Sequence, residues 1–174
     1  MKKIVAVLAL VLGFTGVAKA DLMVEPYLGY EFGKTKDAAK GDLTGSQMGL
    51  RLGYKSPLML WAALDGTFGV SGEFKPEGLA NSDAKRTTLS AVVGVDLPIL
   101  LRAWAGYGLS NEMKFDNGTA KGHNYKIGVG FTGLPFVSLN FEYLNEKFDD
   151  LPAGATGELK NDSYVVSVSL PLSF

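Results

Sequence analysis

The sequence YVVSVSLPLSF, residues 164–174, decides the predicted fold of this chain. Large apolar residues occupy every second position, and they are Tyr164, Val166, Val168, Leu170, Leu172 and Phe174. The residues between them are mainly serines. A period of two is typical of a β-strand with two unlike faces. The stretch therefore predicts a strand that runs up to a C-terminal phenylalanine.

The same period recurs seven more times along the chain. The predicted strands are residues 24–34, 48–55, 60–73, 88–97, 101–110, 124–132, 136–146 and 163–174. Each is around ten residues long, which is the length that a tilted strand needs to cross a membrane. The pattern predicts an all-β protein with eight strands.

The connections between these strands alternate between short and long. Short turns surround Pro57, Pro98 and Pro135, whereas the long connections are polar and rich in glycine, at about 35–45, 74–86, 111–122 and 147–161. Strict alternation places every long loop at one end of an antiparallel meander. Outer-membrane barrels have this arrangement, with long loops outside and short turns in the periplasm. We therefore predict an eight-stranded antiparallel up-and-down transmembrane β-barrel.

A soluble sandwich with a buried apolar face is the alternative interpretation of the same alternation. The placement of the tyrosines argues against it, because six of the seven lie on the apolar face. Five of these are near the long-loop end, and Tyr54 and Phe174 are near the short-turn end. Two aromatic belts around an apolar band are typical of membrane barrels.

The N-terminal sequence MKKIVAVLALVLGFTGVAKA has the features of a secretory signal peptide. We predict a signal peptide at residues 1–20, cleavage between Ala20 and Asp21, and a barrel at residues 21–174. The chain has no cysteine, which excludes a lipoprotein anchor and thiolate chemistry, and its net charge is -1 without a basic block. The sequence therefore predicts no nucleic-acid partner.

Alternating apolar residues that end in phenylalanine resemble the assembly signal of bacterial outer-membrane barrels. The whole predicted barrel resembles the small eight-stranded group that includes OmpX and the transmembrane part of OmpA. This resemblance implies a Gram-negative outer-membrane protein, exported through the periplasm, with membrane lipids and lipopolysaccharide as partners. It also implies that the barrel-assembly machinery reads the last strand, through Tyr164, Leu170, Leu172 and Phe174. A closed barrel has no free edge, so we expect a monomer.

The interior face carries charges of both signs, and their spacing predicts partners. Inward residues that are equidistant from a short turn lie opposite each other. This rule predicts one ion pair in each of three hairpins, namely Arg51–Asp65, Asp96–Arg102 and Lys126–Glu142. Trp61 and Trp104 point inward near the short turns and are expected to close the lumen. We therefore predict a packed, non-conducting interior and a structural or surface-exposed role, such as adhesion or antigenic display.

Two other functions are compatible with the fold. A hydrated lumen with loose ion pairs makes a narrow solute or ion channel. An enzyme that modifies lipids in the outer leaflet needs a nucleophile beside a base, and the single histidine, His123, has no obvious partner in the sequence. We predict no catalytic residue, no metal site and no cofactor. Pro26 and Pro171 remove hydrogen-bond donors, so a loosely bonded short-turn end is expected where the first and last strands meet.

Overall fold

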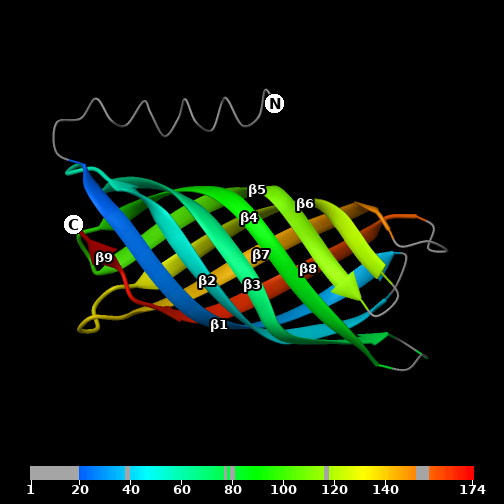
Figure 1. Cartoon of the computed structure of the whole chain (residues 1–174). Helices are drawn as coiled ribbons and strands as arrows, with labels where there is room; N and C mark the ends of the chain where they lie inside the picture. The colour runs from blue at the N-terminus through cyan, green and yellow to red at the C-terminus, as the bar shows by residue number, and fades with distance from the viewer. Residues whose placement is uncertain (1–19, 38–39, 77, 79–80, 116–117, 152–156) are drawn as a thin grey trace.

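Nine β-strands form one closed antiparallel sheet in the computed structural model, which describes residues 20–37, 40–76, 78, 81–115, 118–151 and 157–174 (Figure 1). The predicted signal peptide, except Ala20, lies outside these residues. The strands are β1 Asp21–Asp37, β2 Gly41–Lys55, β3 Leu60–Pro76, β4 Ser82–Leu97, β5 Leu101–Phe115, β6 Gly118–Phe131, β7 Ser138–Asp150, β8 Leu159–Ser169 and β9 Leu172–Ser173.

Each strand from β1 to β7 pairs antiparallel with the next strand in sequence, and β8 returns to pair with β1. The short segment β9 continues the path of β8 and also pairs with β1. The predicted eight-stranded up-and-down barrel is therefore confirmed, with its last strand divided in two. Both ends of the described barrel and the three short turns lie at one end of the molecule (Figure 1).

The seam where the first and last strands meet has more backbone hydrogen bonds at the short-turn end than we expected. Pro171 interrupts the last strand, but the register continues beyond it, with Met23 opposite Ser173. Leu22 and Phe174 then exchange two backbone hydrogen bonds, of 2.9 and 3.0 Å. The expected loosening is thus confined to the interruption at Pro171, because the terminal residues still pair.

The strands extend far into the segments that the sequence predicted as long loops, so that prediction was wrong. Two β-bulges explain the error in the segments 74–86 and 111–122. Val70 is an extra residue in β3, between the pairs Ser46–Ser71 and Gln47–Gly69. Leu109 is an extra residue in β5, between Leu89–Ser110 and Ser90–Gly108. A bulge ends strict alternation and exchanges the two faces of the strand beyond it, which disguised the strand continuations as loops.

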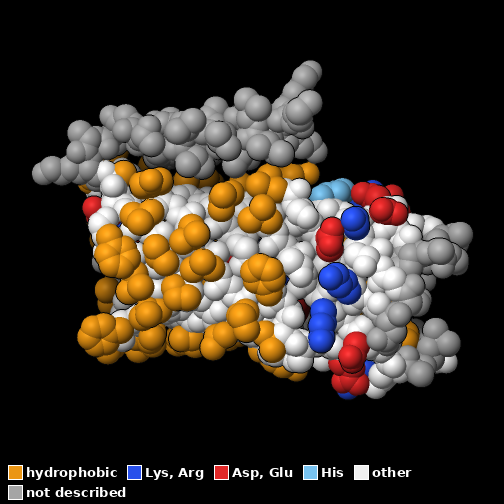
Figure 2. All heavy atoms as spheres, in the orientation of Figure 1, with side chains coloured by type: hydrophobic (Ala, Val, Ile, Leu, Met, Phe, Trp, Pro, Cys, Tyr) orange, Lys and Arg blue, Asp and Glu red, His pale blue; other side chains and the backbone are white. Residues whose placement is uncertain are grey.

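The outer surface of the barrel is apolar around the end that carries the termini and short turns (Figure 2). Leu64, Val93 and Phe141 all expose more than two fifths of their surface. A soluble sandwich would bury these side chains, so that alternative is excluded. The described residues include no helix that is long and apolar enough to cross a membrane.

The tyrosines lie where the sequence placed them. Five are exposed on the outside of the barrel, a sixth, Tyr143, is half-buried there, and only Tyr27 is inside. Beyond the tyrosines, towards the hairpin tips, the surface carries lysines and acidic residues (Figure 2). The boundary between apolar and charged surface marks the level at which the barrel leaves the lipid.

Candidate functional site

Side chains fill the barrel interior, beginning with two tryptophans at the short-turn end. Trp61 and Trp104 are buried, with ring centroids 6.3 Å apart, and pack with Met23, Ala63 and Val92. The prediction that the tryptophans lie inside the barrel is confirmed. An interior of eight strands is only wide enough for side chains of this size.

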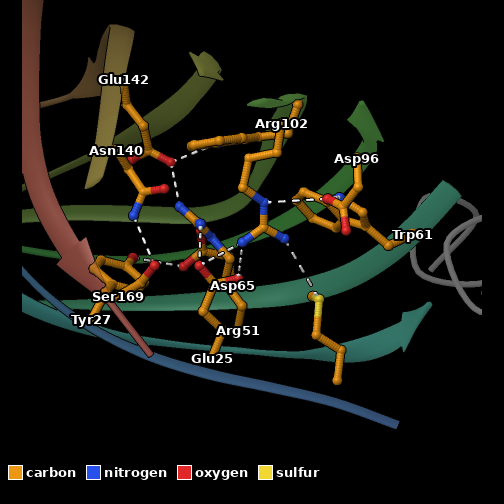
Figure 3. Close-up of polar contacts among 12 residues, drawn as sticks. Glu25, Tyr27, Arg51, Trp61, Asp65, Asp96, Arg102, Asn140, Glu142 and Ser169 are labelled. Carbon is orange, nitrogen blue, oxygen red and sulfur yellow. Dashed lines mark hydrogen bonds and ion pairs between the residues drawn. The ribbon is translucent and has the colours of Figure 1, made fainter. Parts of the chain in front are cut away.

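Further from the short turns than the tryptophans lies a central ionic cluster of three acids and three bases, all of which except Lys126 are labelled in Figure 3. Its members are Glu25, Arg51, Asp65, Arg102, Lys126 and Glu142, and all are buried. Arg51 is at the centre, with its Nε 3.0 Å from Asp65 Oδ2 and its Nη1 3.4 Å from Glu25. Its Nη2 donates to Glu142, across the lumen. The predicted Arg51–Asp65 pair is therefore confirmed.

Arg102 forms the second predicted pair and one that was not predicted. Asp96 is directly opposite Arg102 in the register, and its Oδ1 lies 3.5 Å from Arg102 Nε. Arg102 Nη1 also donates to both carboxylate oxygens of Glu25, each at 2.9 Å. Nearer to the short turns, Asp96 also forms an ion pair with Lys55. This group thus connects the central ionic cluster to the short-turn end.

The third predicted pair, Lys126–Glu142, is wrong. The hairpin between β6 and β7 is centred on Pro135, one residue later than the sequence indicated, so Glu142 faces Gly128 and Lys126 faces Leu144. Lys126 instead reaches across the lumen to Asp65, with Nζ 2.6 Å from Oδ2. Both residues are inside as predicted, but their partners come from strands that are not neighbours.

Aromatic rings complete the central ionic cluster. The Arg51 guanidinium lies 5.0 Å from the centroid of Tyr27 and 4.7 Å from that of Trp104. Tyr27 Oη donates to Asp65 at 2.7 Å, and Trp104 Nε1 donates to Glu142 at 2.7 Å. A buried charge is very costly unless it is paired and hydrogen-bonded. Equal numbers of acids and bases, all with partners, meet that requirement.

A second ionic group, which the alternation in the predicted strands does not reveal, lies further towards the hairpin tips. Arg86 Nη1 contacts Glu31 at 2.7 Å and Glu146 at 3.0 Å, and Arg86 Nη2 contacts Gln47 at 2.7 Å. The predicted long connection 74–86 includes Arg86. Extending the alternation of Thr88 and Ser90 by one step would have placed it inside.

The lumen ends in a ring of apolar side chains near the hairpin tips. Strands β2 to β8 contribute one residue each, in the order Leu43, Phe74, Ala84, Met113, Ala120, Phe148 and Leu159. Because they follow the bulges at Val70 and Leu109, Phe74 and Met113 point inward instead of outward. This outer apolar ring closes the end of the barrel opposite to the tryptophans.

His123 is exposed near the hairpin tips, on the outside of the barrel. Its Nδ1 lies 3.4 Å from Asp149 Oδ2, so the expectation that it has no carboxylate partner was wrong. Asp149 was hidden because it sits on the neighbouring strand, at a register shift. No serine or threonine hydroxyl among the described residues is hydrogen-bonded to the imidazole. The described part of the chain also has no group of three or more residues suited to hold a metal ion.

A closed antiparallel barrel with an apolar exterior and a packed ionic interior defines the class of transmembrane outer-membrane barrels. The family model described as "outer membrane protein beta-barrel domain" matches residues 5–170. The chain belongs to this family and is an outer-membrane protein. No curated protein matches its sequence.

Solved structures of small outer-membrane barrels are similar in fold. Ail, the attachment invasion locus protein of Yersinia pestis, is 15% identical with a TM-score of 0.60, over 87% of this chain and 99% of Ail. Neisserial surface protein A is 18% identical with a TM-score of 0.55, over 86% and 96%. The outer membrane enzyme PagL is 13% identical with a TM-score of 0.51, over 84% and 99%. At these identities the likeness concerns the fold alone.

Proposed function

We propose that this protein is a closed, non-conducting barrel that acts through the surface that its hairpin tips present outside the cell. The observation that carries this proposal is the packing of the barrel interior with buried side chains. Two tryptophans fill the short-turn end, two ionic groups fill the middle, and the outer apolar ring fills the other end. Balanced charge in the central ionic cluster does not attract ions of one sign, whereas a selective pore is lined by one sign.

Planar bilayer recording tests the absence of conductance. The purified, folded protein is expected to give no steady ohmic current. A variant with Phe74→Gly and Phe148→Gly in the outer apolar ring and Trp61→Gly at the other end serves as an opened control, provided that it still shows heat-modifiable migration in gels. Steady conductance from the unmodified chain would contradict the proposal and support the narrow channel.

A surface role, such as adhesion or antigenic display, follows from the strand extensions. Strand β3 runs to Pro76, beyond its last outward aromatic residue, Phe68. The surface of the extensions carries paired charges, including Lys36–Asp162 and Lys147–Glu158, each at 2.8 Å. Paired strands present a stiff surface, which suits recognition.

Surface proteolysis of intact cells tests the exposure of these extensions. Cleavage is expected only near the hairpin tips, close to residues 40, 78 and 157, because the paired strands resist proteases. If the protein is not cleaved in intact cells but is cleaved after lysis, the tips lie on the other side of the membrane.

The proposed partners are outer-membrane lipids, lipopolysaccharide and the barrel-assembly machinery, and we propose a monomer. Lys34, Lys85 and Lys121 are exposed between the outward tyrosines and the hairpin tips, and we propose that they contact the phosphates of lipopolysaccharide. The proposed assembly residues Tyr164, Leu170, Leu172 and Phe174 are all exposed on the outside of the last strand. This apolar stripe is accessible to the machinery before the seam closes.

We also propose that the protein is not an enzyme. The contact between His123 and Asp149 favours catalysis in the outer leaflet as a second candidate, because an oriented histidine can serve as a general base. Mass spectrometry of lipid A from cells that produce the unmodified chain or the His123→Ala variant decides between them. Identical lipid A is expected, whereas acyl loss that depends on His123 would establish the enzyme.

A further inference from the structure

Four of the five most exposed large apolar side chains in the described part of the chain lie at the short-turn end. Leu58 is 75% exposed, Ile99 66%, Phe136 85% and Phe174 74%. One belongs to each of the three short turns, and the fourth is the C-terminal residue. Turns at a water-exposed surface normally carry polar residues. The apolar rim formed by these four residues therefore needs a covering partner.

The three turns share an unusual backbone feature. Met59, Leu100 and Phe136 have φ angles of 65°, 62° and 68°. Glycine adopts this left-handed conformation without strain, whereas bulky side chains rarely do. Each turn thus holds a large apolar residue at the position where a small one is easiest to accommodate. The segments 56–59, 97–100 and 132–137 contain no charged residue.

The distance along the strands between the outward tyrosines and the short turns indicates which partner covers the apolar rim. Tyr107 and Leu101 on β5 are six positions apart, and so are Tyr125 and Phe131 on β6. Six residues span about 20 Å along a strand. A tilt of about 40° reduces this to about 15 Å along the membrane normal, whereas the apolar band of outer-membrane barrels is about 25 Å tall.

The strands β5 and β6 alone therefore fall about 10 Å short of the thickness of the apolar band. The turn residues beyond Leu101 and Phe131 add to this apolar height, because Ile99 and Phe136 lie past the ends of the strands and are exposed. On the face shown in Figure 2, apolar side chains extend from the strands to the end of the barrel, where acidic atoms also appear at the edge. Since the turns follow one another around the barrel, the rim is a circle and not a patch on one side.

From these features we infer that the apolar rim is immersed in the inner leaflet of the outer membrane. The partner is the acyl and glycerol region of the phospholipids, not periplasmic water and not a protein. The turns then extend the lipid-facing surface and set the depth of the barrel. This inference rests on the membrane location and not on the absence of conductance.

Site-directed spin labelling in phospholipid vesicles tests the immersion of the rim. The chain has no cysteine, so Leu58→Cys, Ile99→Cys and Phe136→Cys each carry one label. Val93→Cys is the lipid-facing control, and Lys114→Cys is the water-facing control at the opposite end. The ratio of collision with oxygen to collision with a water-soluble nickel complex is expected to resemble that of Val93→Cys, several-fold above that of Lys114→Cys.

Two outcomes would overturn the inference. Rim labels that meet the nickel complex as often as the Lys114→Cys label would place the turns in water. Rim labels that are shielded in whole outer membranes but not in pure lipid vesicles would identify a protein as the covering partner. Heat-modifiable migration verifies the fold of each variant, and Leu134→Cys in the third turn replaces Phe136→Cys if that variant does not fold.

Discussion

Lys126 on β6 forms its ion pair with Asp65 on β3, across the lumen, and not with Glu142 on the adjacent strand β7. Asp65 also binds Arg51, which in turn binds Glu142. The central ionic cluster therefore links strands from opposite walls of the barrel. Such links hold the walls at a defined distance, which neighbouring pairs within one hairpin do not achieve.

Double-mutant cycles distinguish the two partners of Lys126. The cycle of Lys126→Met with Asp65→Asn is expected to show a coupling on the order of 0.5–3 kcal/mol, since residues in direct contact couple in this range. The cycle of Lys126→Met with Glu142→Gln serves as the matched comparison and should give a smaller value. The free energy of unfolding in urea, measured in lipid vesicles, provides the numbers. A larger coupling to Glu142 would contradict the cross-lumen pair.

The outer apolar ring is expected to contribute strongly to stability. Phe148→Ala removes a fully buried side chain and should lower the free energy of unfolding by about 3–5 kcal/mol, through lost burial and a residual cavity. Lys85→Ala, on the exposed face of β4, is the control and should change it by less than about 0.5 kcal/mol. Similar effects of the two substitutions would show that the ring is loosely packed.

Folding is expected to depend on the presence of an extra residue at the Leu109 bulge and not on the leucine side chain. Deletion of Leu109 restores strict alternation, so Glu112 and Lys114 would exchange faces with Asn111 and Met113. The outer apolar ring would then receive a charge, and the folded fraction in heat-modifiability gels should fall sharply. Leu109→Gly keeps the bulge and should stay mostly folded. Equal behaviour of the two variants would refute this account of the bulge.

Gly128 makes room for a tryptophan inside the barrel. A Cβ atom at Gly128 would overlap the Trp104 indole, so Gly128→Ala should cost about 1–3 kcal/mol by overpacking. The tryptophan emission spectrum should shift as Trp104 moves. At Gly66 the nearest atom to a new Cβ is 3.9 Å away, and Gly66→Ala is the matched control without a spectral change. If neither Gly128→Ala nor Gly66→Ala changes the emission spectrum, Trp104 is not held against Gly128.

Removal of the C-terminal residue tests the assembly role of the last strand. Without Phe174, the outward apolar stripe loses its last member and the two backbone bonds to Leu22 are lost, so the amount of protein in the outer membrane of producing cells should fall several-fold. The purified variant should still fold in detergent, because the other strand pairs remain. Ser173→Ala is the control. Normal membrane levels without Phe174 would show that the machinery reads other residues.

The sequence alone was sufficient to predict the barrel, its strand number, its apolar exterior and which residues of the central ionic cluster lie inside. These features depend on local alternation, which every strand shows by itself. It did not predict the partner of Lys126, the second ionic group around Arg86, the outer apolar ring or the Asp149 contact of His123. Those depend on the curvature that brings non-neighbouring strands together and on bulges that exchange the faces of a strand. Only the closed tertiary structure decides them. A period of two specifies the face on which a residue lies, but it specifies neither the register of the strands nor which residues meet across the lumen.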